Sequence, residues 1–247
     1  MDKIRYPFFD GTSEEEKTFY NVSDFSWAKE LEANWEIIKK EVIAYMQDPK
    51  NLHPYFAKDL MNEPEKWQTF GLYAWGVCVS KKNCEACPET IKILEKIPTI
   101  ISAGVSVMEP NAEIKPHFGD TNATVRCHLG LVVPAGLPEI GFHVGYEDRS
   151  WEEGKLLLFN DAAYHKAWNN TQARRVILLF DVMRPEFATQ KRDVCATVLG
   201  ILSWQFITLK LPFLRILPKI IQKPFCWLLS RFVLLYFSFL KRSSAWL

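Results

Sequence analysis

The first hundred residues contain a helical pattern of hydrophobic positions. Residues 88–97 predict a short helix with Pro88 at its first position, where the missing backbone N–H costs nothing. A longer amphipathic helix is predicted over residues 26–46, because apolar side chains recur there at steps of three or four residues. These side chains are Trp27, Leu31, Trp35, Ile38, Val42 and Tyr45.

From Thr99 the pattern changes to short β-rich runs separated by clusters of Gly, Pro, Asn and Asp. Many short strands at close spacing are typical of a β-sandwich or barrel. The last run is apolar on both faces, so we expect a central, buried strand there. The predicted strands cover residues 100–108, 113–117, 124–133, 139–146, 155–159 and 174–183.

The tail of the chain has a third pattern. Residues 194–209 carry no charge, but sixteen residues are short for a membrane span. Pro212, Pro218 and Pro224 should then interrupt any long helix, while residues 224–240 are apolar apart from Arg231. This pattern favours a two-segment hairpin or a surface-lying element over one transmembrane helix. Ordinary helices packed on the β core are the alternative.

Charge separates the tail from the rest of the 247 residues. The net charge is +1, yet the chain has no Asp or Glu after Asp193 and seven Lys or Arg from Cys195 onward. The remainder holds 23 basic against 29 acidic residues. We therefore expect residues 195–247 to contact an anionic membrane surface, and we expect no nucleic-acid partner.

Two features bear on the compartment. No apolar stretch of signal-peptide length follows Met1, and six cysteines are too few for a disulfide framework. A reducing compartment is therefore favoured. Together with the tail, this predicts a cytoplasm-facing protein that associates with a membrane.

Two of the five histidines lie at the edges of predicted strands. His117 ends the run 113–117, and His165, 48 residues later, precedes the last strand. Such a pair has the layout of a metal site in a jelly roll, although imidazole binds Fe, Zn, Cu and Ni alike. A core or surface histidine with ordinary hydrogen bonds is the alternative for each.

Arg175 begins the apolar last strand, ten residues after His165. An unpaired buried charge is very costly, and no acidic residue in the first half of that strand offers a partner. A dicarboxylic ligand would offer one through a bidentate contact, and an intramolecular ion pair is the alternative.

Three further polar residues lie on neighbouring predicted strands. Arg126 and His128 alternate along one strand, so both side chains face the same side of the sheet. Ser106 on another strand would add a hydroxyl donor. Together with the residues above, they predict a cavity that holds a metal and a ligand with two carboxylates.

Two long stretches resemble the aspartyl/asparaginyl β-hydroxylase family: SVMEPNAEIKPHFGDTNATVRCHLGLVVPAG at 106–136 and RSWEEGKLLLFNDAAYHKAWNNTQARRVILLFDVMRPE at 149–186. RYPFFDG at 5–11 and ELEANW at 30–35 resemble its N-terminal region, so the resemblance covers roughly residues 5–187. It implies a mainly β, cupin-like double-stranded β-helix. The expected organisation is an N-terminal helical flank at 1–98, the β-helix core at 99–187 and the apolar, basic tail at 188–247.

The resemblance also implies an Fe(II)- and 2-oxoglutarate-dependent dioxygenase that uses O2. Its substrate would be a peptide side chain or a membrane-linked, lipid A-like acyl group. A non-catalytic, membrane-associated binding module with the same fold is the alternative. The resemblance assigns six residues: His117 and His165 as iron ligands, Ser106 and Arg175 at the distal carboxylate of 2-oxoglutarate, and Arg126 and His128 at its other end.

Two positions depart from the family's pattern. Oxygenases of this chemistry usually carry a carboxylate two residues after the first histidine, where this chain has Gly119 followed by Asp120. A glycine there is similar to the peptide-hydroxylating members. Members acting on epidermal-growth-factor-like domains carry an arginine at the position of Thr124. A small residue at this position is similar to the lipid A-type members. The two departures therefore imply different substrates.

Overall fold

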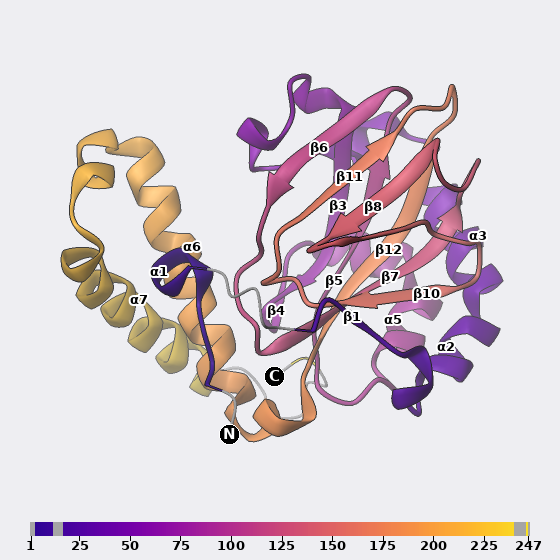
Figure 1. The fold of residues 1–247 in the computed structure, drawn as a ribbon. Coiled ribbons are helices and arrows are strands. Elements are labelled where there is room, and N and C mark those ends of the chain that lie inside the picture. The colour runs from indigo at the N-terminus through magenta and orange to yellow at the C-terminus, as the bar shows by residue number, and fades with distance from the viewer. Residues whose placement is uncertain (1–2, 12–16, 240–245, 247) are drawn as a thin grey trace.

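The computed structural model describes residues 3–11, 17–239 and 246, and its strands form two antiparallel sheets (Figure 1). The eight-stranded sheet consists, in order of pairing, of β1 (Phe19–Tyr20), β10 (Leu156–Phe159), β7 (Thr124–Val132), β12 (Arg175–Met183), β5 (Ile100–Met108), β3 (Trp67–Ala74) and β2 (His53–Pro54), with β4 (Val77–Cys78) paired to β3. The four-stranded sheet consists of β6 (Ala112–His117), β11 (His165–Asn169), β8 (Ile140–Val144) and β9 (Glu147–Arg149).

The order of the strands defines the fold. From β5 onward the chain passes back and forth between the sheets, so that β5, β7, β10 and β12 lie in the larger sheet and β6, β8, β9 and β11 in the smaller. This winding is that of a jelly roll, the double-stranded β-helix. The expected mainly β, cupin-like fold is therefore confirmed, and β12 is central and buried at eight of its nine residues, as its apolar sequence predicted.

Helices cover the outer face of the larger sheet (Figure 1). The helix predicted over residues 26–46 is in fact two helices, α2 (Ala28–Ala33) and α3 (Trp35–Tyr45), because the backbone leaves the helical conformation at Asn34. Fully buried side chains of α3 join the same core cluster as the outward-facing residues of β5, β7 and β12. α4 (Lys81–Ala86) and α5 (Pro88–Leu94) follow, with Pro88 at the first position as predicted.

The sequence pattern missed two strands that position the site. β3 lies in the N-terminal flank, which is therefore not only helical, and it pairs with β5 along the register Thr69↔Ser106 and Gly71↔Gly104. β11 carries His165 and pairs with both β6 and β8. Both strands contain polar or small residues, so their pairing with neighbours, rather than intrinsic propensity, decides their conformation.

The tail forms the predicted two-segment hairpin. α6 (Lys191–Lys210) and α7 (Lys219–Phe239) pack against each other and are joined by a short 3-10 segment, Pro212–Ile216. Pro224 does not break α7, contrary to expectation. It is the sixth residue of the helix, where it removes a single backbone hydrogen bond next to the first turn, whose N–H groups lack intrahelical acceptors in any helix.

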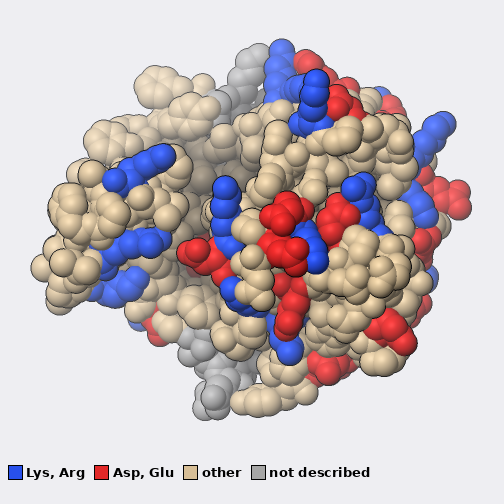
Figure 2. All heavy atoms as spheres, turned by 90° about the horizontal axis from the view of Figure 1, so that it is seen from above, with Lys and Arg blue, Asp and Glu red and all other residues tan. Residues whose placement is uncertain are grey.

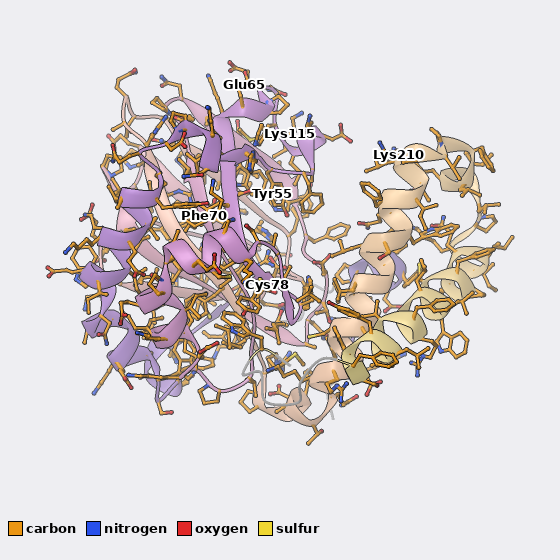
Figure 3. All side chains as sticks on the ribbon, turned by 180° about the vertical axis from the view of Figure 1, so that it is seen from behind. Tyr55, Glu65, Phe70, Cys78, Lys115 and Lys210 are labelled. Carbon is orange, nitrogen blue, oxygen red and sulfur yellow. The ribbon has the colours of Figure 1, made fainter. Side chains whose placement is uncertain are left out.

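The two helices of the hairpin have specific contacts. A Cβ atom at Gly200 would lie 2.6 Å from the Cys226 carbonyl oxygen, so α6 and α7 approach closely there. Trp204 Nε1 donates a hydrogen bond to Gln222 Oε1 at 2.8 Å, and the Trp204 ring stacks on Phe225. The base of the hairpin joins a core cluster with Ile101 and Met183, whereas Lys210 lies at its far end, away from the sheets (Figure 3). The hairpin is therefore an ordered element docked at its base.

Candidate functional site

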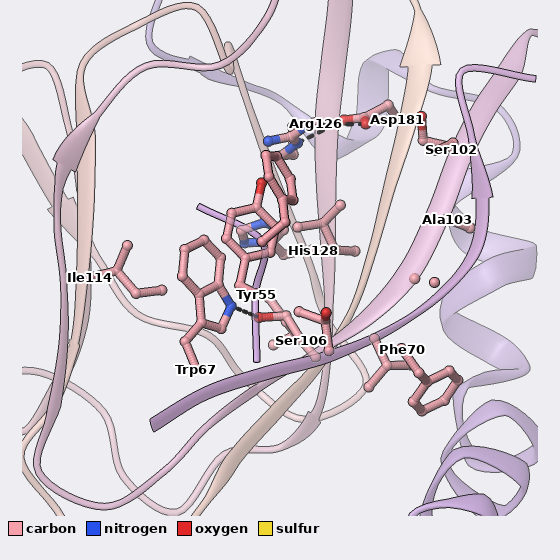
Figure 4. A pocket seen from close by; sticks show the side chains of 18 of the residues that line it. Tyr55, Trp67, Phe70, Ser102, Ala103, Ser106, Ile114, Arg126, His128 and Asp181 are labelled. Atoms are coloured by element: carbon pink, nitrogen blue, oxygen red, sulfur yellow. Dashed lines mark hydrogen bonds and ion pairs between the residues drawn. The ribbon is translucent and has the colours of Figure 1, made fainter. Parts of the chain in front are cut away.

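A cavity of about 420 Å³ lies between the two sheets. Small-molecule sites occupy about 300–1,000 Å³, so the cavity is large enough for a cosubstrate and part of a second ligand. Figure 4 shows part of its lining. All six residues assigned from the sequence line it: Ser106 on β5, His117 on β6, Arg126 and His128 on β7, His165 on β11 and Arg175 on β12.

The two predicted metal-binding histidines are neighbours. His117 and His165 face each other across β6 and β11, with their ring centroids 4.2 Å apart. Nδ1 of each ring lies 2.8 Å from a backbone carbonyl oxygen, that of Lys115 or Ala163 respectively. A carbonyl only accepts, so each Nδ1 carries the proton and each Nε2 has a free lone pair. Metal-binding histidines are usually oriented in this way.

Both rings are neutral at physiological pH. Burial lowers the pKa of His165 well below its usual value, and the neighbouring His117 lowers it further. Burial also lowers the pKa of His117. Because only neutral imidazole binds a metal, the fold keeps both residues in the ligating form.

A carboxylate from another loop fills the space beside Gly119. A Cβ atom at Gly119 would lie 1.6 Å from Asp161 Oδ2, and Asp161 Oδ1 lies 3.7 Å from His165 Nε2. Asp161 thus brings negative charge to the metal-binding side of the cavity although position 119 has no side chain. Two imidazoles and a nearby carboxylate fit a divalent transition-metal ion. Over the described residues, no group of three or more His, Cys, Asp or Glu side chains is placed to hold a metal, and the metal-binding role of the two histidines stays a prediction.

Arg126 is bound by two carboxylates. Its Nη1 donates to Asp161 Oδ1 at 2.5 Å. Its Nε and Nη2 donate to Asp181 at 2.8 and 3.1 Å (Figure 4). Burial lowers the pKa of Arg126, but the two carboxylates outweigh this effect and leave it well above its usual value. The contact of Arg126 with a cosubstrate stays a prediction. The ion pairs themselves show that Arg126 orients Asp161.

Arg175, by contrast, is buried without a carboxylate partner. Its side chain lies over the Trp151 ring at 4.4 Å, and Nη2 is 3.4 Å from Met108 Sδ. Nε and Nη1 have no hydrogen-bond partner among the described residues. Burial lowers the pKa of Arg175 to about 9. Since an unpaired buried guanidinium is costly, this end of the cavity is incomplete without an anion.

Two more donors face the same cavity. His128 Nδ1 accepts a hydrogen bond from Trp151 Nε1 at 3.1 Å, so the proton of the neutral ring is on Nε2, which has no partner in the described structure. Burial lowers the pKa of His128 well below its usual value, and Arg175 lowers it further. Ser106 Oγ accepts from Trp67 Nε1 at 3.0 Å, which leaves its hydroxyl proton available (Figure 4). A ligand for this end must supply acceptors, as a carboxylate does.

Asp120 lies on the same side of the cavity as Asp161, and we expect Asp120→Asn to stabilise the metal-free protein at pH 8. Burial, with repulsion from Asp161, raises the pKa of Asp120 from 3.8 to about 7, so the fold disfavours its ionised form. This penalty is absent below about pH 4, grows as the pH rises and is complete above about pH 7. At 1.36 kcal/mol per pKa unit the gain is at most about 4 kcal/mol, and less where water reaches the carboxyl.

Urea unfolding of wild type and Asp120→Asn at pH 4 and pH 8 would measure the difference in the free energy of unfolding. A gain at pH 8 that vanishes at pH 4 is the expected result. A difference of equal size at both values would show that ionisation of Asp120 is not its cause.

Sequence reasoning missed the acidic members of the site. Asp181 is six residues after Arg175 on β12, so strict alternation places both on one face and signals a cavity position. Asp161 had no comparable signal, because only the fold brings it beside Gly119. Thr124 is buried and does not line the cavity, so position 124 contributes no side chain to the site in the described structure.

A sequence model described as Aspartyl/Asparaginyl beta-hydroxylase matches residues 32–185. An ornithine lipid ester-linked acyl 2-hydroxylase of Rhizobium tropici is 34% identical over 170 residues, which is 67% of this chain and 60% of that protein. The aspartyl/asparaginyl beta-hydroxylase of Homo sapiens is 36% identical over 171 residues, 66% of this chain but 22% of that protein.

Among solved structures, a Pseudomonas putida prolyl-4-hydroxylase aligns with a TM-score of 0.44 and 13% identity, over 60% of this chain and 87% of that one. The chain thus spans less than two thirds of the length of the two sequence relatives. The family match ends at residue 185, before α6 begins.

Proposed function

Because the chain belongs to the aspartyl/asparaginyl β-hydroxylase family, we propose that it is an Fe(II)- and 2-oxoglutarate-dependent dioxygenase that hydroxylates an unactivated C–H bond. One observation carries this proposal: the unpaired guanidinium of Arg175 is buried in the same cavity as two neutral histidines with free Nε2 lone pairs. That combination fits a metal together with an anionic ligand rather than either alone.

Different residues of the chain would bind the metal and the cosubstrate. His117 and His165 would hold Fe(II) through Nε2, and their backbone hydrogen bonds fix the rings. Arg175 and Ser106 would hold the distal carboxylate of 2-oxoglutarate, and the free Nε2–H of His128 would donate to its other end. When bound, Fe(II), 2-oxoglutarate and O2 supply the oxidation, giving succinate, CO2 and one oxygen atom for the substrate.

The carboxylates set the charge near the metal. Arg126 holds Asp161 at its position, with Asp181 bound to the other edge of the guanidinium. Asp161 is thereby directed toward His165, and moving it away would cost its ion pair with Arg126 Nη1. The negative charge there favours a cation at the two imidazoles, which themselves carry none.

Two classes of substrate are proposed, following the names of the relatives. One is a peptide or protein side chain, as for the human aspartyl/asparaginyl beta-hydroxylase, and the other is a lipid-linked acyl group, as for the Rhizobium tropici enzyme. The alternative from another class is a non-catalytic, membrane-associated binding module that retains the fold.

Measuring the release of succinate distinguishes the proposed dioxygenase from the non-catalytic binding module. Purified protein would be incubated with Fe(II), ascorbate, O2 and 2-oxoglutarate, and succinate would be measured with and without candidate substrates. We expect slow release without a substrate, and a stimulated release together with a 16 Da gain on the correct substrate. Binding of 2-oxoglutarate with no succinate under any condition would favour the module.

We further propose that the hairpin places the protein on the cytoplasmic face of an anionic membrane. Its outer side is apolar and basic (Figure 2), whereas acidic and basic residues are mixed over the rest of the molecule in that view. Lys241 and Arg242, which add to the basic charge of the tail, lie outside the described residues. The described basic residues of the hairpin are Lys210, Arg215, Lys219, Lys223 and Arg231.

An interfacial position fits the hairpin better than a span. Over the described residues, α7 alone has the length and composition of a membrane-spanning helix. Its packing on α6 and its charged residues Lys219, Lys223 and Arg231 favour a helix that lies at the headgroup level.

We expect the triple substitution Phe213→Ser, Ile216→Ser and Ile220→Ser to release the protein from anionic vesicles. These side chains are 64%, 84% and 78% exposed at the far end of the hairpin, and full burial of each is worth about 1.5–3 kcal/mol. Affinity should fall by more than about tenfold in vesicle sedimentation, with an unchanged melting temperature. A matched control, Tyr146→Ser, changes an equally exposed aromatic residue on the sheet side. Equal losses in both proteins would contradict the role of the hairpin.

A further inference from the structure

The cavity continues beyond the proposed cosubstrate site toward the hairpin. Arg175 and His128 lie at one end, while the opposite end is lined by Ala74 at the end of β3, by Trp75 directly after it and by Leu202 of α6. Ser106 and Ser102, four residues apart on β5, both line the cavity, so it extends over about 13 Å of that strand. Only part of this length is needed for the cosubstrate.

The floor of the extended part is built from small residues. Thr69 and Gly71 of β3 pair with Ser106 and Gly104 of β5, and these four residues share the inner face. Val79 packs directly on Gly71, because a Cβ atom there would be 3.1 Å from Val79 Cγ1, and so closes the groove on that side. A floor without large side chains, covered by an apolar wall, forms a groove that fits an unbranched chain.

The polar groups near the groove offer little to a charged substrate. Arg126 is bound by both Asp161 and Asp181, and Asp120 adds a third carboxyl group to this region. A carboxylate side chain entering from this end would meet these acids and, among the described residues that line it, no unpaired cation. An uncharged alkyl chain has no such penalty and gains from the burial of apolar surface.

The wall of the groove and the proposed membrane surface belong to one helix. Leu202 is half-buried at the groove, and Phe206 and Leu209, further along α6, are 62% and 53% exposed. Figure 3 shows that the helix then runs away from the sheets to Lys210 at the end of the hairpin. A chain leaving a membrane at the hairpin would therefore meet the groove along α6.

We infer that this groove, lined by Trp75, Val79 and Leu202, is a binding subsite for the alkyl chain of a membrane amphiphile, and that α6 forms part of the substrate entrance. The inference rests on the proposed function and selects the lipid-linked acyl group from its two substrate classes. In that reaction a C–H bond of the chain breaks and a C–O bond forms with one atom of O2. The second oxygen atom enters succinate as 2-oxoglutarate is oxidised and loses CO2.

Binding of a fluorescent fatty acid tests the subsite without metal or turnover. Parinaric acid would be titrated into metal-free full-length protein, and its fluorescence enhancement followed. We expect Leu202→Glu to weaken binding at least tenfold, because it places a charge in the apolar wall. Leu209→Glu is the matched control on the same helix beyond the groove, and should change binding less than twofold. Equal weakening by both substitutions, or no effect of Leu202→Glu, would overturn the inference.

A second variant covers the case in which Leu202→Glu does not fold. Leu202→Phe keeps the wall apolar but narrows the groove, so affinity across saturated C10 to C18 acids should shift toward shorter chains. An unchanged chain-length profile in a folded Leu202→Phe protein would also overturn the inference.

The proposed function is assessed separately, by the visible band of the anaerobic Fe(II)–2-oxoglutarate complex. Wild-type protein could show the band and yet neither bind parinaric acid nor release more succinate with acyl amphiphiles. This result would support the proposed enzyme and contradict the alkyl subsite. Binding of parinaric acid without a band would support the groove and contradict the cofactor assignment. Stronger competition by an unbranched apolar peptide than by a fatty acid would point to a peptide and overturn the inference.

Discussion

We expect Arg175→Met to weaken the binding of 2-oxoglutarate strongly and to leave the fold intact. The guanidinium is 1% exposed and has two nitrogen atoms without partners, so the binding site exists in advance of its ligand. Removing one partner of a buried charge pair costs about 2–5 kcal/mol, which corresponds to a loss of affinity of roughly 30- to 5,000-fold. Because the variant also removes an unpaired buried charge, the ligand-free protein should melt at a higher temperature than wild type.

Isothermal titration with 2-oxoglutarate in the presence of Mn(II), and thermal melting without ligand, would measure the two effects. Arg174→Met is the matched control, because Arg174 is the adjacent residue, is 52% exposed and pairs with Glu109 on the surface. We expect its affinity to stay within twofold of wild type. Arg175→Met protein that binds 2-oxoglutarate as wild type does would remove the main support for the cosubstrate.

We expect His165→Ala to abolish Fe(II) binding and turnover. The side chain is buried and its Nε2 is one of two imidazole lone pairs in the cavity, so its loss leaves a single ligand. Loss of an outer partner of a metal ligand already costs about 10–100-fold, so loss of the ligand should cost more than about 100-fold in Fe(II) affinity.

Anaerobic competition with a coloured chelator would give the Fe(II) affinity, and succinate release would give the turnover. His143→Ala is the control, because His143 lies on the neighbouring strand β8 and pairs with Asp148 at the surface. It should bind Fe(II) as wild type does. Full activity of His165→Ala would show that the metal site has been assigned wrongly.

The core of the fold was predictable because its strands carry strong local signals. β12 is a long apolar run, and its central place between β7 and β5 follows from burial on both faces. β3 was not predictable in the same way. Gln68, Thr69 and Gly71 weaken its pattern, and its conformation depends on pairing with β5.

The residues of the site also differ in whether a local sequence signal predicted them. The unpaired charge of Arg175 follows from the absence of an acid near it in the strand, and the structure retains it. The ion pairs of Arg126 with Asp161 and Asp181 join three separate segments, so no local pattern contains them. No local pattern predicts the contact of Asp161 with Gly119 either. The carboxylate of Asp161 occupies the space that a side chain at position 119 would need.

The tail shows how tertiary contacts change the interpretation of a proline. Pro224 predicted a break, yet α7 continues through it because packing on α6 stabilises the helix on both sides. The match to the family ends at residue 185, whereas the cavity wall includes Leu202. An element outside the matched region therefore contributes to the wall of the cavity.

Anaerobic titration of wild-type protein with Fe(II), with and without 2-oxoglutarate, tests the central claim most directly. We expect a weak visible metal-to-ligand charge-transfer band that requires both components, saturates at one equivalent of Fe(II) and disappears in Arg175→Met. Wild-type protein that binds neither Fe(II) nor 2-oxoglutarate would contradict the claim and leave a double-stranded β-helix whose cavity serves another ligand.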